Sequence, residues 1–190
     1  MHNGSPGPLT CDLCYARGAM NNAVIRDYVP SDQESVLALN QANVPEVGPL
    51  DADKLARLHA EAEWLPVVEI DGELAGFAIL LVEGAAYEST NYAWFQARHE
   101  RFLYVDRIAL GPAARGQGLG QRIYRAAIEK AAAAERPILA AEVNTVPPNE
   151  PSLRFHRRFG FEEQIKRRPY GDTQEVVMLE CSVPSASSTP

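Results

Sequence analysis

The chain has 190 residues, 46% hydrophobic and 23% charged, which is typical of one globular domain and argues against a disordered protein. Its net charge of -7 argues against general nucleic-acid binding, and no apolar run is long enough to span a bilayer. We therefore expect a cytoplasmic domain that works without a nucleic-acid or membrane partner.

The two ends of the chain are expected to lie outside this domain. Residues 1–20 lack the apolar stretch of a signal peptide, so they are predicted to form a disordered extension. Cys11 and Cys14 form a CxxC pair, but Cys181 is the only other cysteine, which excludes a four-cysteine zinc site. No metal is expected. Residues 182–190 are rich in Ser and Pro and are predicted to be a disordered tail, which leaves 21–181 as the domain.

The first half of the domain is predicted to alternate between strands and helices. The elements are a strand at 23–28, a helix at about 31–42, a loop at 44–50, a helix at about 51–64, and strands at 66–70 and 74–82. Asp71-Gly72 between the last two strands predicts a tight hairpin. A longer connection, 83–100, contains Tyr92, Trp94 and Phe95, which either line a ligand pocket or belong to the core.

The second half is organised around residues 102–134. A buried strand is predicted at 102–110, where the chain is apolar and rich in aromatic and β-branched residues. Gly111-Pro112 ends this strand, and a glycine-rich loop then leads into a helix with apolar residues at helical spacing. The remaining predicted elements are a strand at 138–143, a short helix at 151–158, and strands at 160–166 and 174–180.

The glycine-rich loop is predicted to bind phosphate. Amides of such a loop and of the first helical turn have no partners within the helix, and the helix dipole favours negative charge there. Glycine permits positive φ and close approach of a pyrophosphate to the backbone. Gly120-Gln121-Arg122 lacks the Lys-Ser/Thr of a P-loop, and Gln121 occupies the last glycine position of a dinucleotide fingerprint.

Two motifs resemble those of the GNAT superfamily of acetyl-CoA-dependent N-acetyltransferases. They are Leu110-x-Pro112-x-x-Arg115-x-x-Gly118-x-Gly120 and Asn149-x-x-Ser152-x-x-Phe155-His156-x-x-x-Gly160-Phe161. The likeness covers about 23–181 and implies an α/β (α+β) GNAT fold. Its mixed, mostly antiparallel sheet of six to seven strands is flanked by about four helices. Within the superfamily, Asn91-Tyr92-x-Trp94-Phe95 and Tyr104-Val105-Asp106-Arg107 resemble a bacterial group of predicted acetyltransferases.

The resemblance implies direct acetyl transfer, in a ternary complex, from acetyl-CoA to a primary amine of a small molecule or peptide. The central strand would separate from 138–143 to admit the pantetheine arm, and the N–H of Leu110 would stabilise the thioester oxyanion. Arg115 would either contact phosphate or hold the loop. The expected cosubstrate-binding residues are Ile108, Ala109, Leu110, Arg115, Gly116, Gln117, Gly118, Leu119, Gly120, Gln121, Asn149 and Phe155.

The resemblance also suggests acid and base residues. His156 stands where many family members have a tyrosine that protonates the leaving thiolate, so it either donates that proton or only hydrogen-bonds and packs. Tyr104 stands where some members have a basic carboxylate. Asp106, two residues on, and Glu142, on the next strand, are the alternative bases, although either acid could simply pair with Arg107 or another arginine.

Charge is distributed unevenly along the chain. Residues 1–97 carry 4 basic and 14 acidic side chains, whereas 98–168 carry 14 basic and 8 acidic ones. This predicts an anionic cosubstrate in the second half and a cationic acceptor near the first, although ordinary solvated charges explain the split equally well. The alternative function is a GNAT-fold module that binds acyl-CoA without efficient turnover, as a sensor or protein partner. A homodimer is a further option.

Overall fold

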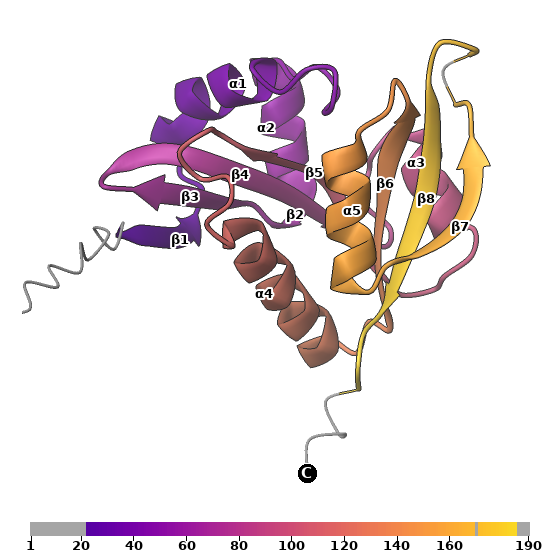
Figure 1. Ribbon diagram of the computed structural model, residues 1–190. Coiled ribbons are helices and arrows are strands. Elements are labelled where there is room, and N and C mark those ends of the chain that lie inside the picture. Colours follow the sequence, from indigo (N-terminus) through magenta and orange to yellow (C-terminus); the bar gives the residue numbers. More distant parts are fainter. Residues whose placement is uncertain (1–21, 170, 186–190) are drawn as a thin grey trace, which may run out of the picture.

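The computed structural model describes residues 22–169 and 171–185 (Figure 1). The predicted extension, with Cys11 and Cys14, lies outside these residues, as does 186–190 of the predicted tail. The elements in chain order are β1 (Ala23–Asp27), the 3-10 helix η1 (Pro30–Asp32), α1 (Gln33–Gln41), α2 (Ala52–Glu61), β2 (Ala62–Trp64), β3 (Pro66–Ile70), β4 (Glu73–Val82), α3 (Thr90–Gln96), β5 (Leu103–Leu110), α4 (Leu119–Ala133), β6 (Ile138–Val146), α5 (Glu150–Phe159), β7 (Glu162–Arg167) and β8 (Glu175–Ser182).

The strands form one mixed sheet in the order β1-β3-β4-β5-β6-β8-β7, with β2 paired to β4 off this path. Only β5 and β6 are parallel; the other described pairs are antiparallel. The predicted fold class is thus confirmed. The described part has eight strands and five α-helices, because the short β2 and α3 lie where the sequence predicted the end of a helix and a long connection. β8 also extends to Ser182, the residue where the tail was predicted to begin.

Helices cover both faces of the sheet. The face under α4 and α5 buries Leu119, Ile123 and Leu153 against strand residues such as Val105. The opposite face buries side chains of α1, α2 and α3, including Phe95, against other strand residues. Figure 1 shows α4 and α5 on the near side of the sheet. Each central strand therefore buries alternate side chains in the cores on both faces of the sheet. A shift of one residue in its pairing would move these side chains to the wrong face, so the pairing register is strongly specified. In the described part, no helix is long and apolar enough to cross a bilayer.

A β-bulge in the middle of β5 organises the centre of the molecule. Leu80 of β4 opposes Val105 and the next residue, Ile79, opposes Arg107, so Asp106 is the extra residue. The bulge places Asp106 and Arg107 on the same face of the sheet, and a bulge also bends its strand. Pairing of β5 with β6 covers only Leu103–Val105 and stops at this point, while β6 continues beside β8. The two central strands therefore diverge, as the resemblance implied.

Candidate active site

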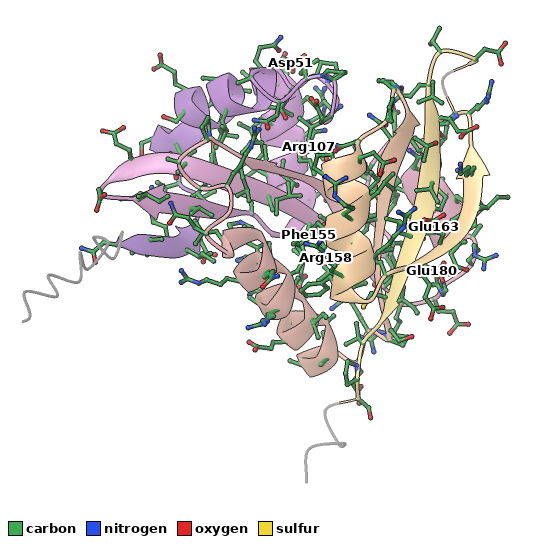
Figure 2. All side chains as sticks on the ribbon, in the orientation of Figure 1. Asp51, Arg107, Phe155, Arg158, Glu163 and Glu180 are labelled. Carbon is green, nitrogen blue, oxygen red and sulfur yellow. The ribbon has the colours of Figure 1, made fainter. Side chains whose placement is uncertain are left out.

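The divergence of β5 and β6 contains a cavity of about 850 Å³. Its walls come from the outer half of β5, from β6, from the start of α4, from α5, and from the connection between α1 and α2. Arg107 of β5 and Phe155 of α5, both labelled in Figure 2, belong to two of these walls. A volume of this size suits a ligand larger than a metabolite of a few atoms.

The backbone of β5 faces the cavity with groups that β6 leaves unpaired. The N–H of Gly111 donates to the carbonyl of Ala75, a residue of β4, at 2.8 Å. Because successive residues of a strand direct their backbone groups to opposite sides, Ala109 also faces β4, whereas Ile108 and Leu110 face the divergence. The Leu110 carbonyl accepts a bond from Arg115 Nε at 2.9 Å. Its N–H remains available to a strand-like ligand.

The loop before α4 has the properties of an anion site. Gly116 and Gly118 have φ of +75° and +73°, in the left-handed region that favours glycine. A Cβ at either position would meet nothing within 4 Å, so the space beside both is empty of protein atoms. α4 begins after Gly118 with no side-chain cap. The amides of its first turn are therefore free to bind phosphate oxygens.

The structure sorts the residues predicted to bind the cosubstrate into two groups. Those that line the cavity are Ile108, Leu110, Arg115, Gly116, Gly120, Asn149 and Phe155. Ala109, Gln117, Gly118, Leu119 and Gln121 do not line it, so any contribution from the last four comes through the loop and helix backbone. The side chain of Ala109 is buried in the core on the opposite face of the sheet, and its contact with the cosubstrate stays a prediction.

Arg115 and Asn149, two residues of the first group, make hydrogen bonds that stabilise the protein itself. The guanidinium of Arg115 donates to the Leu110 carbonyl and, through Nη2, to Asn43 Oδ1 at 2.8 Å. These bonds favour the interpretation that Arg115 holds the loop. Asn149 caps α5, since its Oδ1 accepts a bond from the N–H of Ser152 at 3.2 Å.

Glu142 of β6 projects into the cavity with defined partners. The hydroxyl of Tyr104 donates to its two carboxylate oxygens at 2.9 and 2.7 Å, and Asn91 Nδ2 donates to Oε1 at 3.2 Å. Burial raises the pKa of Glu142 to about 7, against the lowering effect of these hydrogen bonds. A carboxylate with this pKa can take up and release a proton near neutral pH, which suits a general base.

Both carboxylate oxygens of Asp106 accept hydrogen bonds from neighbouring side chains. It accepts bonds from Arg107 Nε at 2.7 Å and from the Tyr87 hydroxyl at 2.5 Å. The same guanidinium donates to Asn40 Oδ1 and to the Gly48 carbonyl, both at 3.0 Å. The structure therefore favours the interpretation that Asp106 pairs with Arg107, joining β5 to the α1–α2 connection. Tyr104 is likewise fully buried, and its hydroxyl orients Glu142.

Asp106→Asn is expected to lower the free energy of unfolding by about 3 kcal/mol, because it leaves the Arg107 charge buried without its counter-charge. Both side chains are only 4% exposed, so water screens the pair little. Urea denaturation measures the change. Arg168 pairs with Asp172 at the surface, and Asp172→Asn, as control, should change stability by less than about 0.5 kcal/mol. Equal losses of unfolding free energy in Asp106→Asn and Asp172→Asn would contradict a stabilising role for the buried Asp106–Arg107 pair.

His156 is held as a neutral imidazole. It is 3% exposed, with Nδ1 2.8 Å from the Ser152 carbonyl oxygen and Nε2 2.8 Å from the Tyr124 hydroxyl. Burial lowers its pKa to about 4. A carbonyl only accepts, so we assign the ring proton to Nδ1, and Nε2 accepts from Tyr124. His156 then has no proton at Nε2 to donate, and the structure favours the hydrogen-bonding role over the predicted acid.

Among the cavity residues that the sequence did not predict as site residues are Tyr124 and Asn91. Tyr124 follows Gly120 by one helical turn and was assigned only to the core face of its helix; it lines both core and cavity. In the aromatic segment, Tyr92 and Phe95 are core residues, and Asn91 faces the cavity instead. Asn91 Oδ1 is buried and has no hydrogen-bond partner within 22–169 and 171–185. The spacing of Asn91 before the two aromatic residues is the only sequence signal for it.

The charged lining of the cavity is balanced. It contains the acids Glu46, Asp106 and Glu142 and the bases Lys54, Arg107 and Arg115. The acidic excess of the first 97 residues is therefore not concentrated on these walls. Among the described residues, no group of three or more His, Cys, Asp or Glu side chains is placed to hold a metal ion.

The family model described as "Acetyltransferase (GNAT) family" matches residues 24–161, a range that contains the glycine loop, Glu142 and His156. The chain belongs to the GNAT acetyltransferase family. This confirms the resemblance that the two motifs indicated. No curated protein matches the chain in sequence.

Solved structures share the GNAT fold at low sequence identity. The ribosomal-protein-S18-alanine N-acetyltransferase from Escherichia coli is 18% identical, with a TM-score of 0.67 over 88% of this chain and 98% of that one. Ard1 from Thermoplasma volcanium is 19% identical, with a TM-score of 0.70 over 86% and 99%. The yncA protein from Salmonella typhimurium, solved with its cofactor acetyl-CoA, is 17% identical, with a TM-score of 0.62 over 90% and 99%.

Proposed function

We propose that this GNAT family member is an N-acetyltransferase that transfers an acetyl group from acetyl-CoA to a primary amine of a small molecule or peptide. The observation that carries the proposal is Glu142, a carboxyl group with a pKa of about 7 in the cavity where β5 and β6 diverge. The base and the cosubstrate path lie on opposite walls of one cavity, so donor and acceptor can meet in a ternary complex.

The residues present fit acetyl-CoA along its length. The free amides at the start of α4 and the glycines at 116 and 118 suit the pyrophosphate. The backbone of Ile108 and Leu110, which β6 leaves unpaired, suits the amide groups of the pantetheine arm. Family membership and the acetyl-CoA bound to yncA support the same assignment. No part of this path calls for a metal.

In this proposal the protein's own groups act on both sides of the reacting carbonyl. The amine nitrogen forms a bond to the carbonyl carbon, the carbon–sulfur bond breaks, and the electron pair leaves with sulfur. An amine that arrives as an ammonium first loses one proton to Glu142, which passes it to water. After the neutral nitrogen has attacked, Glu142 accepts the second proton and later returns it to water. The N–H of Leu110 stabilises negative charge on the carbonyl oxygen. Tyr104 and Asn91 keep the carboxylate of Glu142 aimed at the nitrogen.

The acceptor is proposed to be a cationic amine. Asn91 Oδ1 is a buried acceptor without a partner in the described part of the chain, and it lies beside the Glu142 carboxylate. A buried unpaired acceptor is costly, and an ammonium or amine N–H would satisfy it. Asn91 and Glu142 together therefore suit an amino group that arrives protonated.

A panel of amines with acetyl-CoA tests this proposal. Spermidine, lysine amide and a peptide with a free alanine N-terminus are expected to give free thiol and an acetylated product, identified by mass spectrometry. Glutamate should react at least tenfold more slowly, and added salt should lower kcat/KM for spermidine by weakening charge attraction. Faster acetylation of glutamate would contradict a cationic acceptor. Tight acetyl-CoA binding with no acetylated product would favour the non-catalytic module.

A further inference from the structure

The cavity contains a primary amine that belongs to the chain itself. The sequence has three lysines, Lys54, Lys130 and Lys166, and of these only Lys54 lines the cavity. Lys166 pairs with Glu175 near the surface, and the ammonium of Lys130 lies over the ring of Trp64. Within 22–169 and 171–185, the Lys54 ammonium has no ion-pair partner.

The start of α2 determines where this amine is presented. Asp51 caps the helix by accepting a bond from the N–H of Lys54 at 2.7 Å, which holds the lysine in the first turn. Lys54 Nζ donates one long hydrogen bond, to the Pro49 carbonyl at 3.4 Å. An ammonium has three N–H donors on a flexible four-carbon stem, and this single contact does not hold the stem in one rotamer.

The Lys54 amine lies beside the proposed cosubstrate path. Arg107 Nη1 donates to the Gly48 carbonyl at 3.0 Å, and Lys54 Nζ contacts the carbonyl of the next residue, Pro49. Lys54 and Arg107 thus bind adjacent carbonyls of the α1–α2 connection. Arg107 directly precedes Ile108, the first residue of the cosubstrate path along β5. The amine therefore lies on the acceptor side of the cavity, next to this path.

The surroundings of the amine favour its neutral form. Burial lowers the pKa of Lys54, and the positive charge of Arg107 lowers it further. Asp106 and Asp51 act in the opposite direction, and Arg57 adds to the lowering. A lysine becomes a nucleophile when it is desolvated beside another cation, because more of the neutral amine is then present at a given pH.

We propose that the protein acetylates itself, transferring the acetyl group of bound acetyl-CoA to Nζ of Lys54. The inference rests on the proposed function, because it uses the same cosubstrate site. The ammonium first releases a proton to water. The neutral nitrogen then forms a bond to the carbonyl carbon, the carbon–sulfur bond breaks, and the electron pair leaves with sulfur. The nitrogen loses its second proton to water and the thiolate takes one up, so the products are N-acetylated Lys54, coenzyme A and one proton.

This modification changes the charge of the cavity. An acetylated lysine is neutral, so the reaction removes one of the three bases among the described residues of the lining. The acids Glu46, Asp106 and Glu142 then outnumber Arg107 and Arg115. Self-acetylation therefore makes the cavity more attractive to a cationic acceptor.

Incubation of the full chain with acetyl-CoA, without any added amine, tests this inference. Proteolysis and mass spectrometry should find acetylation at Lys54 at least about tenfold faster than at Lys130 or Lys166, the matched controls for uncatalysed reaction with acetyl-CoA. The rate constant should saturate with acetyl-CoA and be independent of protein concentration, because amine and cosubstrate site belong to one molecule. Excess coenzyme A, which competes for the site, should slow acetylation of Lys54 alone.

Lys54→Arg keeps the positive charge but removes the nucleophile, because a guanidinium stays protonated. This variant should lose the saturable acetylation without transferring it to another lysine, whereas Lys130→Arg should retain it. Mapping of the acetylated residue in the wild type decides the site even if Lys54→Arg does not fold.

Equal acetylation of the three lysines, or a rate constant that rises in proportion to protein concentration, would overturn the inference. Acetylation of spermidine with Lys54 left unmodified would overturn it and leave the proposed function standing. Acetylation of Lys54 with no reaction of any free amine would support it and contradict the proposed function. Failure of the wild-type protein to bind acetyl-CoA would overturn both.

Discussion

Glu142→Gln is expected to lower kcat/KM for acetyl transfer by about a thousandfold, within the range usual for loss of a general base. The substitution keeps the shape of the side chain and one oxygen for the bond from Tyr104, but removes the ability to accept a proton. Acetyl-CoA affinity should stay near the wild-type value, because Glu142 lies on the wall opposite the proposed cosubstrate path.

The pH dependence gives this prediction a second readout. In the wild type, kcat/KM should rise as Glu142 ionises, with an apparent pKa of about 7, and this limb should vanish in Glu142→Gln. The contribution of Glu142 to the free energy of unfolding should fall over the same pH range in which kcat/KM rises. The pKa of Glu142 is raised above its ordinary value of 4.5, so folding favours the protonated form, and this contribution is lost as pH rises to about 7.

A carboxylate away from the cavity is the control. Glu163 of β7 pairs with Arg157 at 2.7 Å near the surface, and Glu163→Gln should leave both kcat/KM and its pH profile unchanged. Full activity of Glu142→Gln would contradict the assignment of the base. A loss with an unchanged pH profile would show that Glu142 only shapes the cavity.

Gly118→Asp is expected to weaken acetyl-CoA binding by a factor of about 1,000, as measured by calorimetry. Gly118 has a φ of +73° and precedes the first turn of α4. Any side chain there is strained, and aspartate also places a negative charge where the pyrophosphate is proposed to lie. The carboxylate could cap the helix amides itself, which would remove them from the ligand.

Gly72→Asp separates backbone strain from loss of the anion site. Gly72 at the β3–β4 turn has a φ of +86° and, like Gly118, has no atom within 4 Å of a Cβ position. Both variants should lose a similar amount of thermal stability. Only Gly118→Asp should lose acetyl-CoA affinity, and unchanged affinity in that variant would place the pyrophosphate elsewhere.

The sequence predicted the centre of the fold well because its signals there are local. The apolar strand, the glycine loop and the amphipathic helix over 102–134 correspond to β5 and α4, and Asp71-Gly72 forms the expected turn with φ of +52° and +86°. The three-residue β2 and seven-residue α3 were missed since elements so short carry little periodicity.

The chemistry of the site depends on contacts between distant residues, which a single sequence does not reveal. Asp106 was a possible base by its place on a strand, but the bulge turns it towards Arg107. Glu142 was an alternative base, and what favours it is its burial beside Tyr104 and Asn91. His156 was a possible acid, and what favours the hydrogen-bonding role is its contact with the Ser152 carbonyl together with that to Tyr124, 32 residues away.

Hydrogen exchange with and without coenzyme A tests most directly whether the divergence of β5 and β6 is the cosubstrate site. Coenzyme A should slow exchange at the amides of Ile108 and Leu110 and at the first turn of α4. Leu103–Val105, already paired with β6, should show no change. Protection confined to other elements, with these amides exchanging as in the free protein, would contradict the proposed binding mode and the function built on it.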